Sequence, residues 1–334
     1  MRRQAHMELV SKKTLILVAG RGHLELAEEV AENLRIPLGD VVLSTFANGE
    51  IYCRFGESIR GADVFVFQSH CPPINDRLME QMIMIDAAKR ASAKRITAVS
   101  PFYGYARQDR KAEGREPITA RLVADMISVS GADRVVTVDL HTGQIQGFFN
   151  FPVDHLTAVP VISEYLASVV EGEVTVVSPD AGGGKLARRY ANRLEDRGGL
   201  VVDLAFIDKR RPKGTHNVAE ATEVVGEVEG RTCVLVDDMI DTAGTVVSAA
   251  SLLMDRGASD VYVAATHGLF SGPAVDRLKS APVREVVVTN SLVIPEDKRF
   301  DSLRILSIAP LLADAISAIF VEGSVSQLFD GDNV

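Results

Sequence analysis

Short apolar runs and longer amphipathic runs alternate along almost the whole chain. The apolar runs predict strands at residues 14–19, 63–68, 95–100, 134–139, 174–178, 232–237, 260–266 and 285–289. The amphipathic runs predict helices at residues 23–34, 75–91, 118–130, 160–169, 184–196, 245–255 and 273–279. Strands that alternate with helices in this way form parallel sheets covered by helices. In such sheets, ligands bind beyond the carboxyl ends of the strands.

A weak internal echo suggests that one α/β unit occurs twice. A Ser-Pro pair ends an apolar run at residues 98–101 and another at residues 176–179. Similarly, one apolar run ends in Asp139 and another in Asp237. Duplication of the unit explains this order, and chance similarity between buried strands is the alternative.

The length of 334 residues is enough for two domains with full cores. We place the first domain at residues 1–158 and the second at residues 159–307. The boundary region is the Pro- and His-containing segment 151–155. A final helical segment, within residues 308–330, is expected to pack back onto the first domain.

The composition is that of a soluble globular protein, with 46% hydrophobic and 24% charged residues. The net charge of −9 argues against a dominant nucleic-acid-binding face. No apolar run approaches the length of a membrane span, so we expect neither nucleic acid nor membrane as a partner. The amino terminus lacks the apolar core of a secretion signal, and the three cysteines form no CxxC pair. These features predict a cytoplasmic location.

The most informative stretch places carboxylates, hydroxyls and glycine between an apolar strand and a helix. Asp237 and Asp238 come first, and a turn then leads into the helix through Asp241, Thr242, Ala243, Gly244 and Thr245. The amides of such a turn and the helix amino terminus favour a phosphate dianion. Two carboxylates can accept hydrogen bonds from vicinal sugar hydroxyls, whereas a simple capped helix does not explain two adjacent aspartates. The stretch resembles the phosphoribosyl-binding motif of the type I phosphoribosyltransferase fold.

Two other strand ends carry groups suited to magnesium. His141 follows the strand that ends at Asp139, and Asp180 precedes three glycines. Mg²⁺ prefers a few carboxylates together with phosphate oxygens. The glycine run is not a Walker A loop, because Leu186 stands where Ser or Thr is required. A histidine packed in a loop and a plain strand-to-helix turn are the alternatives.

Two segments have the chemistry of a nucleotide site. Arg107 and Gln108 follow an aromatic stretch, and aromatic rings beside cations suit a purine near polyphosphate. Phe46, Asn48 and Glu50 lie in a hairpin-like turn and could hold an adenine ring and its amino edge. Taken alone, the first segment is more often a solvated loop, and the second needs only simple hairpin geometry.

A basic segment follows the apolar run at residues 204–207 and contains Lys209 and Arg211. A loop with this charge could close over a transferring phosphoryl group and neutralise the charge that develops on it. A solvated basic turn is the alternative.

Taken in order along the chain, these stretches resemble the ribose-phosphate pyrophosphokinase family, in particular its bacterial, phosphate-activated class. The likeness runs from the first strand to the carboxyl-terminal segment. It implies an α/β protein with two tandem type I phosphoribosyltransferase-like domains, each a mainly parallel sheet flanked by helices, in a homohexamer. It also implies Mg²⁺-dependent transfer of the pyrophosphoryl group of ATP to the anomeric hydroxyl of ribose 5-phosphate. The products would be AMP and 5-phosphoribosyl 1-diphosphate for nucleotide, histidine and tryptophan biosynthesis.

The same resemblance implies a role for each candidate residue. The catalytic residues would be Lys209 and Arg211. ATP would be bound, partly across a subunit interface, by Phe46, Asn48, Glu50, Arg107, Gln108 and His141. Ribose 5-phosphate would be bound by Asp237, Asp238, Asp241, Thr242, Ala243, Gly244 and Thr245. Mg²⁺ would be held by His141 and Asp180, and activating inorganic phosphate by Ser58 and Arg60.

Two departures from the family pattern and two other interpretations stay open. Asp208 replaces a frequent histidine beside Lys209, and residues 182–185 differ from the usual glycine pair followed by an apolar residue. A phosphoribosyltransferase that consumes the diphosphate would not need the duplicated domain or the ATP-type loop. A non-catalytic, synthase-associated regulator of the same fold should have lost the Lys209 or Asp180 loops, and both are intact.

Overall fold

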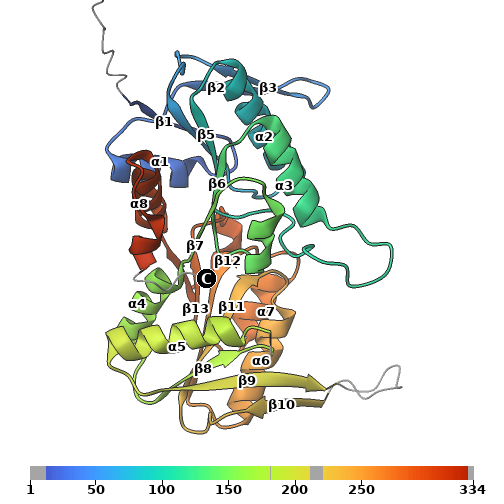
Figure 1. Ribbon diagram of the computed structural model, residues 1–334. Helices are drawn as coiled ribbons and strands as arrows, with labels where there is room; N and C mark the ends of the chain where they lie inside the picture. Colours follow the sequence, from blue (N-terminus) through green and yellow to red (C-terminus); the bar gives the residue numbers. More distant parts are fainter. Residues whose placement is uncertain (1–12, 181, 211–220, 330–334) are drawn as a thin grey trace, which may run out of the picture.

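The computed structural model describes residues 13–180, 182–210 and 221–329, which form two α/β units (Figure 1). The first sheet consists of β1 (Leu15–Ala19), β4 (Asp63–Phe67), β5 (Arg95–Ser100), β6 (Arg134–Val138) and β7 (Val153–Leu156), in this order and all parallel. The helices of this unit are α1 (Leu24–Leu34), α2 (Ile74–Arg90) and α3 (Thr119–Ser130).

The second sheet has the strand order β10–β9–β8–β11–β12–β13–β14. Its strands are β8 (Val174–Ser178), β9 (Val202–Arg210), β10 (Ala221–Val225), β11 (Thr232–Ile240), β12 (Asp260–Gly268), β13 (Glu285–Thr289) and β14 (Leu303–Leu306). Only the β9–β10 pair is antiparallel among these neighbours in the described residues. The helices of this unit are α4 (Val159–Val169), α5 (Gly184–Gly198), α6 (Gly244–Asp255) and α7 (Ala274–Ser280). The predicted architecture, two mainly parallel sheets flanked by helices, is confirmed.

Hydrophobic patterning explains why these segments adopt their structures. All five residues of β4 are buried, as expected for a strand covered on both faces. On α1, the buried residues Leu26, Ala27, Val30 and Ala31 recur at helical spacing and form one face. Every predicted strand and helix is present, with ends displaced by at most a few residues.

Two local features differ from the expectation. β11 does not end at Asp237 but continues to Ile240, because Met239 and Ile240 still pair with β12. The expected boundary segment 151–155 contains most of β7, which pairs with β6 as the edge strand of the first sheet. The hairpin-like turn expected at Phe46 to Glu50 is present, and it joins β2 (Val41–Thr45) and β3 (Ile51–Phe55) in a separate antiparallel hairpin.

The carboxyl-terminal helix α8 (Ala309–Phe320) packs against α1, far from it in sequence (Figure 1). Buried side chains of both helices belong to one continuous apolar core, which also includes Phe65 of β4 and Val234 of β11. The two sheets therefore share this core, while each unit also has a core of its own, with Met84 and Ile85 in the first and Leu253 and Val263 in the second. Short 3₁₀ helices occupy Gly143–Phe148, Glu296–Lys298 and Val325–Phe329. None of the helices described is long and apolar enough to cross a membrane.

Candidate active site

The carboxyl ends of β6 and β11 meet at a His–Asp contact. Asp237 and Asp238 lie on β11, and His141 lies on the loop that follows β6. Nδ1 of His141 is 2.8 Å from Oδ2 of Asp238. Oδ1 of Asp237 accepts a hydrogen bond of 2.9 Å from the backbone N–H of Asp238. The structure thus brings together residues that the sequence assigned to the ribose 5-phosphate, ATP and metal sites.

The protonation states of these three groups are perturbed by one another. Burial, together with the neighbouring Asp238 and Asp180 carboxylates, raises the pKa of Asp237 to about 8. Burial would also raise the pKa of Asp238, but the hydrogen bonds from His141 and Asp237 outweigh it and lower that pKa. The hydrogen bond to Asp238 raises the pKa of His141. One carboxyl of the pair is therefore protonated near neutral pH, while the other pairs with the histidine.

The phosphate-type loop begins directly after β11. Ala243 precedes the first helical residue of α6 in a left-handed conformation (φ 59°), and no side chain caps the helix. The carbonyl oxygen of Thr242 accepts a hydrogen bond of 2.9 Å from Arg277, which fixes the turn. The first amides of α6, among them those of Gly244 and Thr245, are therefore left without a side-chain cap, a suitable environment for a phosphate group.

A cation of the nucleotide-type segment reaches this loop. The guanidinium of Arg107 forms an ion pair of 2.7 Å with Asp241. Burial alone would raise the pKa of Asp241, but hydrogen bonds from Ser271 and Arg107 lower it. The carboxylate is therefore ionised, and it joins the segment after β5 to the loop after β11.

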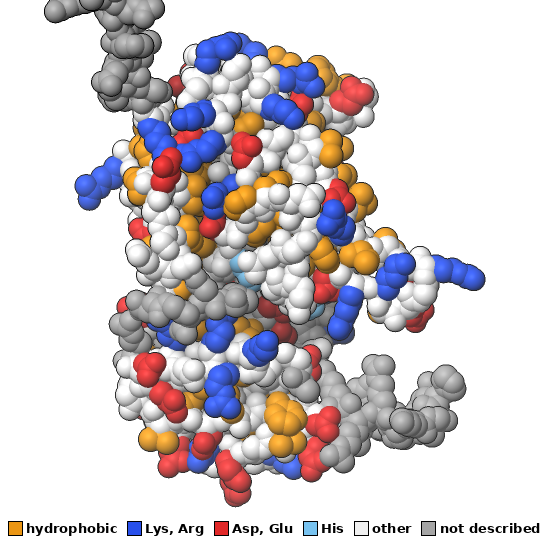
Figure 2. Space-filling model, in the orientation of Figure 1, with side chains coloured by type: hydrophobic (Ala, Val, Ile, Leu, Met, Phe, Trp, Pro, Cys, Tyr) orange, Lys and Arg blue, Asp and Glu red, His pale blue; other side chains and the backbone are white. Residues whose placement is uncertain are grey.

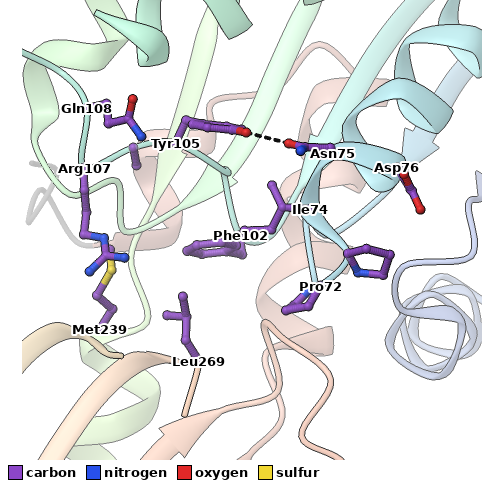
Figure 3. Close-up of a pocket in the computed structure, with 12 residues that line it drawn as sticks. Pro72, Ile74, Asn75, Asp76, Phe102, Tyr105, Arg107, Gln108, Met239 and Leu269 are labelled. Atoms are coloured by element: carbon purple, nitrogen blue, oxygen red, sulfur yellow. Dashed lines mark hydrogen bonds between the residues drawn. The ribbon is translucent and has the colours of Figure 1, made fainter. Parts of the chain in front are cut away.

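Arg107 and Gln108 also line a cavity of about 500 Å³ beside this ion pair. Figure 3 shows them on one side of the cavity and Pro72 and Ile74 on the other, with Phe102 between. Met239 and Leu269 contribute further apolar lining. In Figure 2 the segment between β5 and α3 forms a projecting lobe that carries several Lys and Arg side chains. The cavity therefore combines an apolar surface for a ring with nearby positive charge.

Asp180 lies at the carboxyl end of β8, the strand next to β11. Its Oδ1 accepts hydrogen bonds from the amides of Gly182 (2.8 Å) and Gly183 (3.0 Å). Its charge contributes to the raised pKa of Asp237, so the two carboxylates lie near each other. The described residues contain no cluster of three or more His, Cys, Asp or Glu that could hold a metal by itself.

The hairpin candidates lie elsewhere in the chain. Phe46, Asn48 and Glu50 are at the tip of the β2–β3 hairpin, at the end of the molecule opposite α6 (Figure 1). The Phe46 ring is 54% exposed and stands edge-on to Tyr52 at 5.9 Å. Oδ1 of Asn48 accepts a hydrogen bond of 3.2 Å from the amide of Glu50. Within one chain, these three residues are thus not brought to the His141–Asp238 cluster.

The remaining candidates are placed only in part. Lys209 is at the end of β9, where its backbone pairs with Thr222 of β10. Arg211 lies outside the described residues. Ser58 and Arg60 are exposed on the turn between β3 and β4. Because this turn precedes β4, it lies at the amino ends of the parallel strands, away from the cluster.

Several residues of the site were not predicted. Oγ1 of Thr142 donates a hydrogen bond of 2.7 Å to Asp109, which joins the two loops of the first unit. Phe102 and Met239 line the cavity. Asp109 stands beside Arg107 and Gln108, so its position was a usable signal; the packing of Met239 had no signal in the sequence.

Two tandem parallel α/β units, with paired aspartates and a phosphate-type loop at the end of a central strand, define a protein of the phosphoribosyltransferase fold class. A family model described as the N-terminal domain of ribose phosphate pyrophosphokinase matches residues 15–131. A second, described as the phosphoribosyl synthetase-associated domain, matches residues 207–330.

Comparisons over nearly the full length agree with this class. The ribose-phosphate pyrophosphokinase of Bifidobacterium longum is 57% identical over 321 residues, which cover 95% of this chain and 93% of the relative. That of Mycobacterium tuberculosis is 56% identical over 323 residues, with 96% and 98% covered. The crystal structure of phosphoribosylpyrophosphate synthetase from Mycobacterium smegmatis superposes with a TM-score of 0.87 at 54% identity, covering 93% of this chain and all of that one.

The chain belongs to the ribose-phosphate pyrophosphokinase family. It is an enzyme, a transferase of nucleotide biosynthesis that makes phosphoribosyl diphosphate. This excludes the non-catalytic regulator that the sequence left open.

Proposed function

We propose that the enzyme transfers the pyrophosphoryl group of Mg²⁺-bound ATP to the anomeric hydroxyl of ribose 5-phosphate. The products are AMP and 5-phosphoribosyl 1-diphosphate, which supplies nucleotide, histidine and tryptophan biosynthesis. The observation that carries the proposal is the meeting of two sets of residues at one point. Arg107 and His141 have nucleotide-type chemistry, and they contact Asp241 and Asp238 of the sugar-phosphate stretch.

Ribose 5-phosphate binds at the end of β11. The Asp237 and Asp238 carboxyl groups accept hydrogen bonds from the ribose hydroxyls, and the phosphate lies on the loop from Asp241 to Thr245. Support comes from the ionised state of Asp238 and from the uncapped start of α6.

ATP binds on the side of the cavity, where Arg107 and Gln108 hold the nucleotide beside Phe102 and Leu269. Phe46, Asn48 and Glu50 reach the nucleotide from a neighbouring copy in a homohexamer. The exposed Phe46 ring at a hairpin tip, far from the cluster of its own chain, supports this assignment to a subunit interface.

Asp180 and His141 would hold Mg²⁺ together with phosphate oxygens of the substrates. The donor set fits this hard cation, because carboxylate oxygens crowd here strongly enough to raise the pKa of Asp237 to about 8. A divalent cation relieves that repulsion, and few protein ligands are needed when phosphates supply the rest. Mg²⁺ held there would neutralise negative charge on the phosphate groups of the substrates.

The reaction needs alignment and charge neutralisation more than a covalent intermediate. The anomeric oxygen attacks the β-phosphorus in line, and a new O–P bond forms. The bond from the β-phosphorus to the oxygen it shares with the α-phosphate breaks, AMP leaves with that oxygen, and the hydroxyl proton passes to solvent. Lys209 and Arg211 neutralise charge on the transferred group, so no dedicated general base is assigned. We further propose a cytoplasmic enzyme activated by inorganic phosphate at Ser58 and Arg60, away from the catalytic cluster.

Oxygen isotopes test the direction of attack. The enzyme is given ATP and ribose 5-phosphate whose anomeric oxygen has been equilibrated with H₂¹⁸O, in the same water. We expect ¹⁸O in the bridge between C1 and phosphorus of the product, located by ³¹P NMR, and unlabelled AMP. Label in AMP, or in free diphosphate, would mean that water or the α-phosphorus is attacked and would overturn the proposal.

A further inference from the structure

The loop that carries His141 is anchored on the second sheet. Asp139, two residues before His141, is buried and has a left-handed backbone (φ 36°). Its Oδ2 accepts hydrogen bonds from the amide of Ala158 (2.8 Å) and from Oγ1 of Thr266 on β12 (2.6 Å). A non-glycine residue adopts this conformation only where its surroundings hold it there.

His267 adds a second anchor at the same place. Its Nε2 lies 3.1 Å from the carbonyl oxygen of Val138 and 3.0 Å from that of Asp139. Complete burial lowers the pKa of His267, so the ring is neutral. Because carbonyl oxygens only accept, Nε2 carries the hydrogen, and Nδ1 accepts from the Ser291 hydroxyl at 2.8 Å.

The register of the second sheet relates these anchors to the catalytic cluster. On β12, Ala265 is paired with Asp237 of β11, and His267 is paired with Met239. Thr266 and His267 therefore hold the end of β6 on the strand next to the one that carries Asp238. Connectivity alone cannot place His141 beside Asp238, because 97 residues separate them.

We infer that Thr266 and His267 are positioning residues for the reaction. They hold the segment from Asp139 to His141 so that His141 meets Asp238 at the ribose 5-phosphate site. Thr266 and His267 themselves are not proposed to contact ATP or ribose 5-phosphate. The inference rests on the proposed function only in giving His141 and Asp238 their roles at the substrates.

A matched pair of variants tests the Thr266 contact. Thr266→Val keeps the shape but removes the hydroxyl, whereas Thr266→Ser keeps the hydroxyl and removes the methyl. We expect kcat of Thr266→Val to fall about 10- to 100-fold, the cost of a displaced catalytic contact. The KM for ATP should change little, because Thr266 does not itself line the cavity, and Thr266→Ser should retain most of kcat.

A spectroscopic readout separates positioning from general stabilisation. The ¹⁵N chemical shift of His141 Nδ1, assigned with His141→Gln in histidine-labelled protein, reports its hydrogen bond to Asp238. It should move in Thr266→Val and stay at the wild-type value in Thr266→Ser, whatever happens to Tm. Ser291→Ala, which removes the donor to His267, should move it in the same direction and carries the test if Thr266→Val does not fold.

The inference fails if, in both Thr266→Val and Ser291→Ala, the ¹⁵N chemical shift of His141 Nδ1 stays at its wild-type value and kcat stays within about twofold of wild type. It also fails if Thr266→Ser behaves like Thr266→Val, since the hydroxyl would then not be the cause. These outcomes are distinct from failure of the proposed function. That failure appears as wild-type enzyme that forms no ribose 5-phosphate-dependent AMP, even though its His141 signal still responds to the variants.

Discussion

Nδ1 of His141 lies 2.8 Å from Oδ2 of Asp238, although Asp238 lies on β11 of the second sheet and His141 on the loop after β6 of the first. This contact joins the loop that carries His141, which has nucleotide-type chemistry, to the sugar-phosphate stretch that carries Asp238. It also fixes the charge distribution, since the hydrogen bond raises the pKa of His141 and lowers that of Asp238. An aspartate that is ionised and held in this way is suited to accept hydrogen bonds from ribose hydroxyls.

Asp238→Asn should therefore impair both catalysis and ribose 5-phosphate binding. The amide keeps the size of the side chain but loses the charge-assisted hydrogen bond, which is worth about 1.5–3 kcal/mol. We expect kcat/KM for ribose 5-phosphate to fall about 10- to 100-fold. Steady-state kinetics at saturating ATP measures it, with Asp255→Asn, at the far end of α6, as the control. A change of less than twofold in Asp238→Asn would remove this residue from the site.

Asp237→Asn should stabilise the metal-free protein at high pH. A carboxyl whose folded pKa is raised to about 8 from 3.8 favours folding below its unfolded pKa and loses that contribution as pH rises through 8. An amide cannot ionise, so the variant keeps the contribution. Each unit of pKa shift is worth about 1.4 kcal/mol; allowing for partial exposure, we expect a gain of about 1 kcal/mol or more at pH 8.

Thermal unfolding in EDTA measures this difference at pH 4 and pH 8. The Tm of Asp237→Asn should exceed that of wild type at pH 8 and match it at pH 4, where both side chains are neutral. An equal Tm at pH 8 would show that Asp237 is not destabilised by its neighbours.

His70 should make the protein sensitive to acid. The ring is fully buried: Nδ1 accepts from the amide of Gly104 at 2.9 Å, and Nε2 lies 2.8 Å from Oε1 of Gln81. Burial lowers the pKa of His70 from 6.5 to about 4. The neutral ring therefore stabilises the fold above pH 6.5, and this contribution is lost as pH falls from 6.5 to 4, by about 3 kcal/mol in total.

His70→Asn tests this assignment, because the amide oxygen can still accept from Gly104 but does not titrate in this range. Its free energy of unfolding, measured in urea, should fall less steeply than that of wild type between pH 6.5 and pH 4.5. Parallel slopes for the two proteins would assign the acid sensitivity to other groups.

Arg107 should contribute to ATP use through its guanidinium geometry as well as its charge. It pairs with Asp241 at 2.7 Å and lines the cavity, and lysine lacks the planar, forked donors with which a guanidinium binds phosphate. We expect Arg107→Lys to lower kcat/KM for ATP by about tenfold. Arg90→Ala removes an exposed cation of α2 that pairs only with Asp86 among the described contacts, and it should stay within twofold of wild type.

The sequence predicted what depends on local pattern. Buried strands such as β4 and amphipathic helices such as α1 follow directly from the spacing of apolar residues. β7, at a sheet edge, has few buried positions and therefore gave no clear pattern. The rule that ligands bind at the carboxyl ends of parallel strands was enough to predict Asp180, His141 and Asp238 on the same side of the fold.

Contacts between distant segments could not be predicted in this way. The Arg107–Asp241 ion pair and the Asp139–Thr266 hydrogen bond depend on how the two sheets are set against each other. Nothing in the residues around Thr266 distinguishes it from an ordinary buried strand position. The roles of Lys209 and Arg211 stay predictions, because the structure does not describe their side chains. The role of the Phe46 hairpin also stays a prediction, because it requires a second copy of the chain.

AMP formation measures the proposed reaction itself. The enzyme is incubated with ATP and Mg²⁺, with and without ribose 5-phosphate, beside the Lys209→Ala variant, and AMP is quantified by chromatography. We predict AMP that depends on ribose 5-phosphate, appears in equal amount with phosphoribosyl diphosphate, rises with added inorganic phosphate and collapses in Lys209→Ala. Folded wild-type protein that binds ribose 5-phosphate but yields no AMP under any of these conditions would contradict the proposed pyrophosphoryl transfer.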